Sequence, residues 1–492
     1  MFGLPLLSLI IFLPVLGILI LFFIPKAQTS TIRGVSVATT LVTFLLSLLI
    51  LAHFNTAQPG FQLEEKLSWI PQVNINYHVG VDGLSYSMIF LTALLCFLAC
   101  FASFSIKDRI KEYFIFYLML EVGMIGTFLA LDLFLFYVFW EITLVPMYFL
   151  IGIWGGSRKE YAAIKFFLYT LAGSVFMLLG ILALYFNSAP HTFSIVELIA
   201  QNSLFPRLFQ NIIFAALFFG FAIKVPVFPF HTWLPDAHVE APTPASVLLA
   251  GVLLKMGGYG FFRISYPILP EAAKFFAPAI ALLALIGIVY GAFVAMAQTD
   301  FKKMVAYSSV SHMGFVMLGL ASLNPIGFSG AYLQMFNHGI ITGAMFLLVG
   351  VLYDRAHTRD LNAFGGLREV VPVFSGMLIF FSLASLGLPG LSGFVSEFLS
   401  LLGGFKAFRL FTIISVTGII VTAGYILFMI QRILLGPLNP KWKSLAEINT
   451  REILTLVPLL ILTLALGVYP KLILDILNPG LNLILKAIGV AN

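Results

Sequence analysis

Long apolar stretches separated by shorter polar segments run along the whole chain of 492 residues. A helix that crosses a bilayer needs roughly 20 mainly apolar residues, and about fourteen stretches meet this requirement. These stretches are centred near residues 14, 43, 95, 121, 143, 175, 219, 254, 285, 312, 340, 388, 423 and 463. The longest breaks between them are 55–80, 188–207 and 437–452. The pattern predicts an all-α polytopic membrane protein with about 14 transmembrane helices.

The seventh and twelfth stretches contain residues that interrupt a helix. The seventh reads FFGFAIKVPVFPFHTWLP, and the twelfth reads FFSLASLGLPGLSGFVSEF. Proline removes a backbone donor and clashes with the preceding turn, and glycine loosens what remains. Interrupted backbone at membrane depth is tolerated only where protein buries it or where it lines a hydrated cavity. Matching interruptions in two halves of a chain indicate inverted repeats. We therefore expect two inverted five-helix repeats with broken helices 7 and 12; independent proline kinks are the alternative.

This organisation divides the chain into four parts. Residues 1–112 hold helices 1–3, and residues 113–266 form the first inverted repeat, helices 4–8. Residues 267–436 form the second inverted repeat, helices 9–13, and residues 437–492 hold helix 14 and the C-terminal tail. The short apolar stretch 479–490 is expected to lie on the surface or to cap the last helix.

Composition and charge distribution agree with a membrane protein. Hydrophobic residues make up 60% of the chain and charged residues 10%, whereas soluble domains carry about 25% charged residues. Loops after odd-numbered helices hold 17 basic residues and the opposite side holds 8. Basic loops face the cytoplasm, so we expect a multi-pass protein of the cell inner (plasma) membrane with both termini on the non-cytoplasmic side. The apolar run Leu4–Ile24 lacks a basic segment and a cleavage site and is interpreted as a retained helix rather than a signal peptide.

The sequence contains no pattern typical of a bound redox cofactor. Cys96 and Cys100 lie four residues apart on one face of an apolar helix, pointing the same way. We therefore interpret them as small core residues with no disulfide and no metal or redox role. No Rossmann fingerprint, Walker loop, CxxC pair or haem motif is present. We expect no cofactor and no metal in this chain.

Two lysines, Lys224 and Lys255, lie inside apolar stretches. A charged side chain at the bilayer centre costs at least ~2.5–3.5 kcal/mol on insertion scales. Such groups commonly mark an ion or proton path, whereas snorkelling to the membrane surface is the structural alternative. Their central positions favour the path.

Four further groups at membrane depth extend this set. Glu141, His312, His338 and Glu397 each lie within an apolar stretch. Carboxyl, amine and imidazole groups exchange protons, and the ordinary pKa of histidine lies near neutral pH. Forming or breaking a Glu141–Lys224 pair would switch the lysine between holding and releasing its proton. The alternatives are a purely structural Glu141–Lys224 pair and histidines that only hydrogen-bond neighbouring helices.

Other polar residues are weaker candidates. Glu121, in FYLMLEVGMIG, is a second candidate acid that nothing in the sequence orients, and His231 lies near the membrane edge; both are candidates for proton uptake or release. Asp132, at a helix boundary, is expected to be solvated. The run His231, Asp236, His238 and Glu240 has side chains that bind metals, but its surroundings, FHTWLPDAHVEAPTPAS, favour a rigid loop at the membrane surface over a metal site.

Three motifs resemble one known family. FPFHTWLPDAHVEAPTPASVLLAGVLLKMGGYG, SSVSHMG and LPGLSGFVSEF are similar to the antiporter-like subunits of respiratory complex I and to the related Mrp antiporter subunits, over about residues 80–440. The resemblance implies a fourteen-helix core and a proton channel with charged residues on helices 5, 7, 8 and 12. Glu141, Lys224, Lys255 and Glu397 occupy those positions. A glutamate on helix 12 is typical of the M-type subunits, whereas L-type, N-type and Mrp subunits typically have lysine there.

The resemblance also implies an activity and partners. It implies proton translocation within NADH:quinone oxidoreductase, or a ferredoxin-driven plastoquinone relative, with L- and N-type subunits as neighbours. NAD, FMN, iron–sulfur clusters and quinone are then expected in partner subunits. A proton that crosses against 100 mV costs ~2.3 kcal/mol, so the chain needs a driving partner. The alternatives are a subunit of an Mrp-type sodium/proton antiporter and a purely structural subunit.

Overall fold

The computed structural model describes residues 5–56 and 58–490, and these form a mostly helical bundle. Thirteen helices in this part of the chain are long and apolar enough to cross a membrane. They are α1 (Leu6–Phe23), α2 (Thr29–His53), α3 (Gly83–Ala102), α4 (Ile110–Leu129), α5 (Leu133–Trp154), α6 (Lys159–Asn187), α8 (Arg207–Lys224), the composite span Thr243–Ile268, α13 (Pro270–Met296), α14 (Phe301–Ala321), α15 (Pro325–Ala356), α18 (Arg409–Leu434) and α19 (Thr450–Val468).

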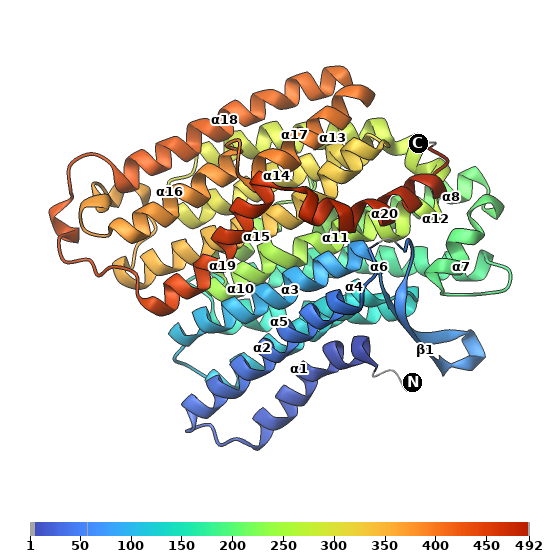
Figure 1. Ribbon diagram of the computed structural model, residues 1–492, viewed down its shortest axis with the longest axis horizontal. Coiled ribbons are helices and arrows are strands. Elements are labelled where there is room, and N and C mark those ends of the chain that lie inside the picture. The colour runs from blue at the N-terminus through green and yellow to red at the C-terminus, as the bar shows by residue number, and fades with distance from the viewer. Residues whose placement is uncertain (1–4, 57, 491–492) are drawn as a thin grey trace.

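The remaining predicted span consists of two short helices. α16 (Pro372–Leu386) and α17 (Ser392–Ala407) have 15 and 16 residues, so neither is long enough to cross a bilayer alone. Together they form the twelfth span. The prediction of a polytopic helical membrane protein is therefore confirmed, and both ends of the chain lie at the same end of the bundle (Figure 1).

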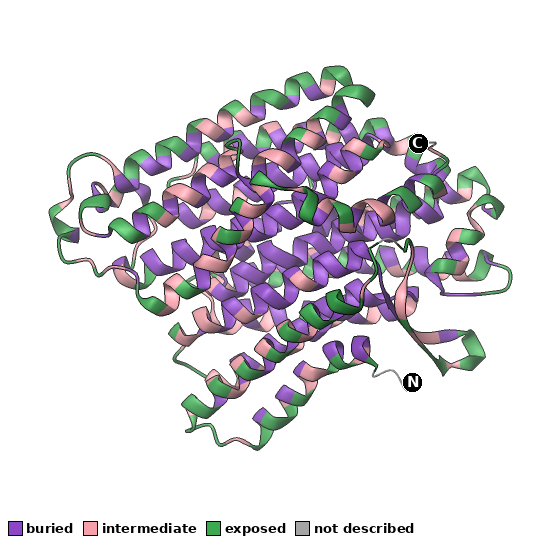
Figure 2. Ribbon diagram, in the orientation of Figure 1, coloured by how far each residue is buried: buried purple, intermediate pink, exposed green. Residues whose placement is uncertain are grey.

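Burial is concentrated in the middle of the bundle. The composite span Thr243–Ile268 and α15 are buried along their most apolar windows, 100% in each case, whereas the corresponding window of α1 is 39% buried. Figure 2 shows the same contrast between the buried centre and the exposed outer helices. A helix enclosed by other helices has no contact with lipid, so its polar side chains face protein. These enclosed helices carry Lys255 and His338.

The seventh helix is broken directly after Lys224. α8 ends there, residues 225–232 are not helical, and the chain resumes as α9 (Trp233–Glu240). Pro226 has no N–H group, so the regular helical hydrogen bond at this position is lost. The Val227 N–H donates to the Ala222 carbonyl at 2.8 Å. The indole Nε1–H of Trp233 donates to the Ile223 carbonyl at 2.9 Å. The carbonyls of Ala222 and Ile223, in the last turn of α8, thus stay paired at the break.

The twelfth helix is broken at its glycines. Gly387 ends α16 with φ +83°, and Gly390 has φ +93°, backbone values that other residues rarely adopt. The chain resumes at Ser392, whose carbonyl accepts a hydrogen bond from Asn337 Nδ2 at 2.7 Å. The two halves are therefore held by α15, which lies beside both.

The eighth span changes its helical pitch twice. α10 (Thr243–Leu248) is followed by a π-helical segment, Leu249–Leu253, by α11 (Leu254–Gly260) and by a second π-helical segment, Phe261–Ser265, before α12 (Tyr266–Ile268). π-helical turns leave carbonyls free for other donors and occur frequently at functional sites. Here the Ala250 carbonyl accepts a hydrogen bond from the Lys255 ammonium group.

Three segments outside the long helices complete the fold. The polar break 55–80 is mostly an antiparallel hairpin of β1 (Gln62–Ile70) and β2 (Ile75–Val81), which projects beyond the bundle (Figure 1). α7 (Ile195–Ala200) is a short helix in the break 188–207. α20 (Lys471–Ala487) packs against α3 and α15, and it begins eight residues before the apolar stretch 479–490.

The prediction that Asp132 is solvated is wrong. Asp132 is only 1% exposed, because β2 covers it. Its carboxylate accepts hydrogen bonds from the backbone N–H groups of Phe134 at 2.9 Å and Asn76 at 3.1 Å. Asp132 therefore caps α5 and ties the hairpin to the bundle.

Replacing Gly83 with alanine is expected to loosen α20. A Cβ at Gly83 would collide with the Ile476 carbonyl oxygen on α20, a backbone atom that cannot move freely. We expect Gly83→Ala to destabilise the protein by about 1–3 kcal/mol, measured as a lower thermal midpoint of the solubilised protein. Gly424→Ala on α18 is the matched control, since nothing lies within 4 Å of its added Cβ. Equal midpoints for the two variants would contradict this packing.

Candidate functional site

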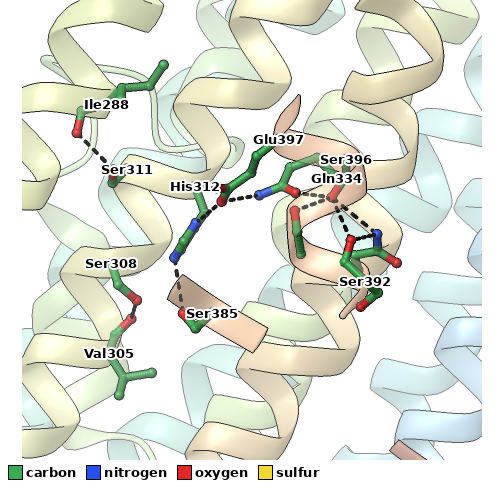
Figure 3. Close-up of polar contacts among 12 residues, drawn as sticks. Ile288, Val305, Ser308, Ser311, His312, Gln334, Ser385, Ser392, Ser396 and Glu397 are labelled. Atoms are coloured by element: carbon green, nitrogen blue, oxygen red, sulfur yellow. Dashed lines mark hydrogen bonds and ion pairs between the residues drawn. The ribbon is translucent and has the colours of Figure 1, made fainter. Parts of the chain in front are cut away.

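The first group of candidate residues meets where α14, α15 and the two halves of the twelfth helix come together (Figure 3). His312 on α14 lies with its Nδ1 2.7 Å from Glu397 Oε1 on α17. Its other ring nitrogen lies 3.2 Å from the Ser385 hydroxyl on α16. Gln334 on α15 donates to Glu397 Oε1 at 3.3 Å and accepts from the Ser396 hydroxyl at 2.5 Å. Both sides of the broken helix therefore contact one imidazole.

Lys255 joins this group through His338. Lys255 is fully buried, and its Nζ lies 2.7 Å from His338 Nδ1 on α15. The His338 and His312 rings are 5.7 Å apart between centroids, and His338 Nε2 has no hydrogen-bond partner within the described residues. Four of the six predicted relay residues thus form one buried line: Lys255, His338, His312 and Glu397.

A small cavity lies between the two histidines. His312, His338, Glu397, Thr342 and Ser385 are among its lining residues. Its volume of about 10 Å³ is of the size that one water molecule needs, and its walls supply several polar partners. One water molecule there would connect His338 to His312.

Lys224 and Glu141 form a separate pair in the first half of the chain. Lys224 is 1% exposed, and its Nζ lies 5.2 Å from the centre of the Trp140 ring and 5.8 Å from that of Phe166. It interacts electrostatically with Glu141, but no ion pair within 4.0 Å joins them in the described part of the chain. Glu141 is half-buried and interacts with the Ser174 hydroxyl on α6. Lys224 and Glu141 therefore interact without forming a direct ion pair.

The two groups are not joined. Across residues 5–56 and 58–490, no hydrogen bond or ion pair links Lys224 to Lys255. The helices that carry them still pack tightly, because a Cβ at Gly257 would lie 2.7 Å from the Phe221 carbonyl oxygen. Apolar packing therefore separates the Glu141–Lys224 pair from the Lys255 line.

Glu121 and His231 lie outside both groups. Glu121 on α4 is fully buried, and neither of its carboxylate oxygens has a hydrogen-bond partner in the described structure. Its electrostatic neighbours include the thiols of Cys96 and Cys100, which are free and buried. His231 is buried beside Phe228 and Tyr290. Within the described structure, no hydrogen bond or ion pair joins either residue to a member of the predicted relay.

The side chains of the run from His231 to Glu240 do not converge. Asp236 pairs with Lys165, the His238 ring stacks on Phe346 at 4.6 Å, and Glu240 accepts the Arg158 N–H at 2.9 Å. No group of three or more His, Cys, Asp or Glu residues in the described ranges is arranged to hold a metal.

Two buried cations were missed from the sequence, because they were counted among the 17 and the 8 basic residues of the loops. Lys302, near the start of α14, is buried and donates to the Ala241 carbonyl at 2.5 Å. Arg263 in the eighth span forms a buried ion pair with Asp82, 2.6 Å between Nη2 and Oδ1. Each lies only one or two turns inside a helix end, so hydropathy alone does not separate it from a loop residue.

Lys302 also lines a larger polar cavity. This cavity has a volume of about 400 Å³, and Glu240, Asp354 and Arg359 contribute to its wall. His238 lies near it, fully buried, with electrostatic interactions with both Lys302 and Lys255. The cavity lies beside the loop after α5, because Gly156 and Ser157 also line it.

The bundle, its two broken helices and its buried exchangeable groups define an ion-translocating membrane protein. Residues 130–422 match the family described as NADH:quinone oxidoreductase/Mrp antiporter, transmembrane, and the chain belongs to this family. The resemblance stated from the sequence motifs is thereby confirmed.

Relatives within the family are similar over nearly their whole length. The chain is 45% identical to NADH-quinone oxidoreductase subunit M of Rhodobacter capsulatus, covering 96% of this chain and 95% of the relative. It is 43% identical to NADH-ubiquinone oxidoreductase chain 4 of Arabidopsis thaliana, covering 97% and 96%.

Solved structures agree with this placement. A chain of respiratory complex I from Thermus thermophilus with bound NADH matches with a TM-score of 0.90 and 30% identity, covering 99% of this chain and 100% of that one. A chain of the Mrp complex from Dietzia sp. matches with a TM-score of 0.87 and 20% identity, covering 99% and 100%. The second match shows a shared fold.

Trp233→Phe tests how the broken seventh helix is held. The substitution removes the indole N–H and leaves the buried Ile223 carbonyl unpaired, which costs about 1–3 kcal/mol. We expect a lower thermal midpoint of the solubilised protein. The control is Trp69→Phe on the exposed hairpin, where no such bond is lost. Unfolding at the same temperature for both variants would show that the indole bond does not stabilise the break.

Proposed function

We propose that this chain is a proton-translocating membrane-arm subunit of a complex I-type NADH:quinone oxidoreductase. The observation that carries the proposal is the buried line Lys255, His338, His312 and Glu397, in which exchangeable groups are 2.7 Å apart at each end. The relatives support the proposal, because they are NADH-quinone oxidoreductase subunit M and NADH-ubiquinone oxidoreductase chain 4.

The line supplies a route for a proton through the second half of the chain. The Lys255 ammonium group gives a proton to His338 Nδ1, and His338 releases a proton from Nε2. One water molecule in the small cavity passes a proton to the imidazole of His312, which gives one to the Glu397 carboxylate. Each step moves one proton between groups that neighbour each other or the cavity.

Glu141 and Lys224 act as the switch at the start of the relay. When the two groups close into an ion pair, the carboxylate stabilises the charged lysine. When they separate, the charged lysine loses this stabilisation. Opening the pair therefore favours release of the proton from Lys224. Glu121 and His231 remain our candidates for proton uptake or release.

The division into repeats supports this arrangement. In the proposed first repeat (113–266) and second repeat (267–436), the broken helix is the fourth of five, α8 with α9 and α16 with α17. Residues 1–112 and 437–492 flank them. Equivalent breaks place Lys224 and Glu397 beside matching interruptions in the two halves.

Partner subunits supply the energy. A proton moved against 100 mV costs ~2.3 kcal/mol, and redox chemistry in other subunits, with NAD, FMN, iron–sulfur clusters and quinone, provides it. L- and N-type antiporter-like subunits are the proposed neighbours in the membrane. A subunit of an Mrp-type sodium/proton antiporter is the second candidate, because the fold is shared. The acid at Glu397 favours the first.

Substitution of the relay residues tests the function. In vesicles that contain the assembled complex, we expect Lys224→Ala, Lys255→Ala and Glu397→Gln each to lower proton transport per NADH oxidised at least about tenfold, as loss of an acid–base group does. Lys406→Ala, an exposed cation on the same helix as Glu397, serves as the control and is expected to pump normally.

The same vesicles separate the alternatives. Normal pumping by an assembled Lys224→Ala complex would establish a purely structural subunit. Turnover that is sustained by a sodium gradient without protons would establish the antiporter. Proton transport that is lost in the relay variants and insensitive to sodium supports our proposal.

We also propose that both termini lie on the non-cytoplasmic side. Ser157 follows the fifth helix on the basic side, and Gln72 lies on the opposite side in the hairpin; both are exposed. A membrane-impermeant maleimide should label Ser157→Cys from the cytoplasm and Gln72→Cys from the other side only. The native cysteines are buried, so background labelling is low. The reverse pattern would invert the topology.

A further inference from the structure

A polar contact outside the relay joins α6 to the second half of the broken seventh helix. Lys165 Nζ on α6 lies 2.7 Å from Asp236 Oδ2 on α9. One turn further along α6, the Tyr169 hydroxyl lies 2.8 Å from the Thr232 hydroxyl, next to the start of α9. α9 is therefore bound to α6 by two polar contacts.

An apolar contact between the same helices leads toward Lys224. The Phe166 ring on α6 packs on the Trp233 ring of α9, with 5.4 Å between centroids. Phe166 also lies close to Lys224, whose ammonium group is 5.8 Å from the centre of the ring. Trp233 also donates its indole N–H to the carbonyl of Ile223, directly before Lys224. Movement of α9 would thus change the surroundings of Lys224.

The same helix also contacts the partner of Lys224. Ser174, nine residues after Lys165 on α6, interacts with the Glu141 carboxylate. α6 therefore contacts Glu141 through Ser174, Lys224 through Phe166 and α9 through Lys165. One continuous helix sets the relative positions of three parts of the switch.

We propose that Lys165 and Asp236 are positioning residues whose ion pair fixes α9 against α6 and so sets the geometry between Lys224 and Glu141. This inference rests on the proposed relay function. α9 has eight residues and is preceded by the non-helical segment 225–232, and Lys165–Asp236 is the one ion pair that joins it to α6 in the described residues. A directional ion pair fixes that position, whereas apolar contacts alone permit sliding.

The partial exposure of the Lys165–Asp236 ion pair separates a positioning role from a role in stabilising the fold. The side chains of Lys165 and Asp236 are 21% and 26% exposed, and partly exposed pairs contribute little to overall stability. Removing the pair should therefore leave the complex assembled. Small displacements of reacting groups, in contrast, lower rates strongly.

A charge-swap series in the assembled complex tests the inference. We expect Asp236→Asn and Lys165→Gln each to lower protons moved per NADH oxidised several-fold, with the double variant no worse than either single one. Lys165→Asp combined with Asp236→Lys recreates the pair in reverse and should restore at least half of the pumping. The matched control is Lys274→Gln, which removes an exposed ion pair with Glu271 and should pump normally.

Two results would overturn the positioning role. One is normal pumping in both single variants; the other is a charge-swap variant as impaired as they are. If Asp236→Asn does not assemble, Asp236→Glu takes its place. This variant keeps the negative charge but shifts it by one methylene group, so the complex should pump at an intermediate level. Unchanged or fully lost pumping there counts against the role.

Lys224→Ala, measured in parallel, separates this inference from the proposed function. Loss of pumping in Lys224→Ala together with normal pumping in Asp236→Asn rejects only the positioning pair. Normal pumping in Lys224→Ala rejects the relay itself, whatever the charge-swap series shows.

Discussion

The structure depends on one constraint: a charge at membrane depth must be surrounded by protein instead of lipid. The eighth span and α15 satisfy it, since both are enclosed by other helices. Lys255 and His338 lie on these two helices and contact each other. The inner helices are kept away from the bilayer by the outer ones. These outer helices are α1, α2, α18 and α19, and they carry none of the predicted relay residues.

The breaks in two helices are stabilised by partners for several of the backbone groups that they free. At the seventh helix the partners are a shifted backbone donor and the Trp233 indole. At the twelfth, left-handed glycines make the turn, and Asn337 holds the carbonyl of Ser392. The result is that polar side chains from both halves of a helix can reach one point, as Ser385 and Glu397 do around His312 (Figure 3).

Much of the fold could be predicted from the sequence, because the thickness of a bilayer fixes the length of the apolar stretches that cross it. The spans, both interruptions and the six exchangeable residues follow from that pattern. The contacts do not: nothing in the sequence indicates that Lys255 meets His338 or that Lys224 stands apart from Glu141. Asp132 was misjudged because its burial depends on a hairpin that hydropathy does not reveal. Lys302 and Arg263 were missed because a cation near a helix end resembles one in a loop.

The apolar packing between Lys224 and Lys255 has a consequence for the membrane as a whole. An unbroken chain of proton carriers from one surface to the other would be a short circuit, through which the voltage across the membrane would discharge. Gly257 lets α11 lie directly against α8 at Phe221, and no carrier bridges this point in the described structure. For the proposed relay, this gap between the two groups means that the conformation seen here would hold a gradient and would conduct only after a rearrangement.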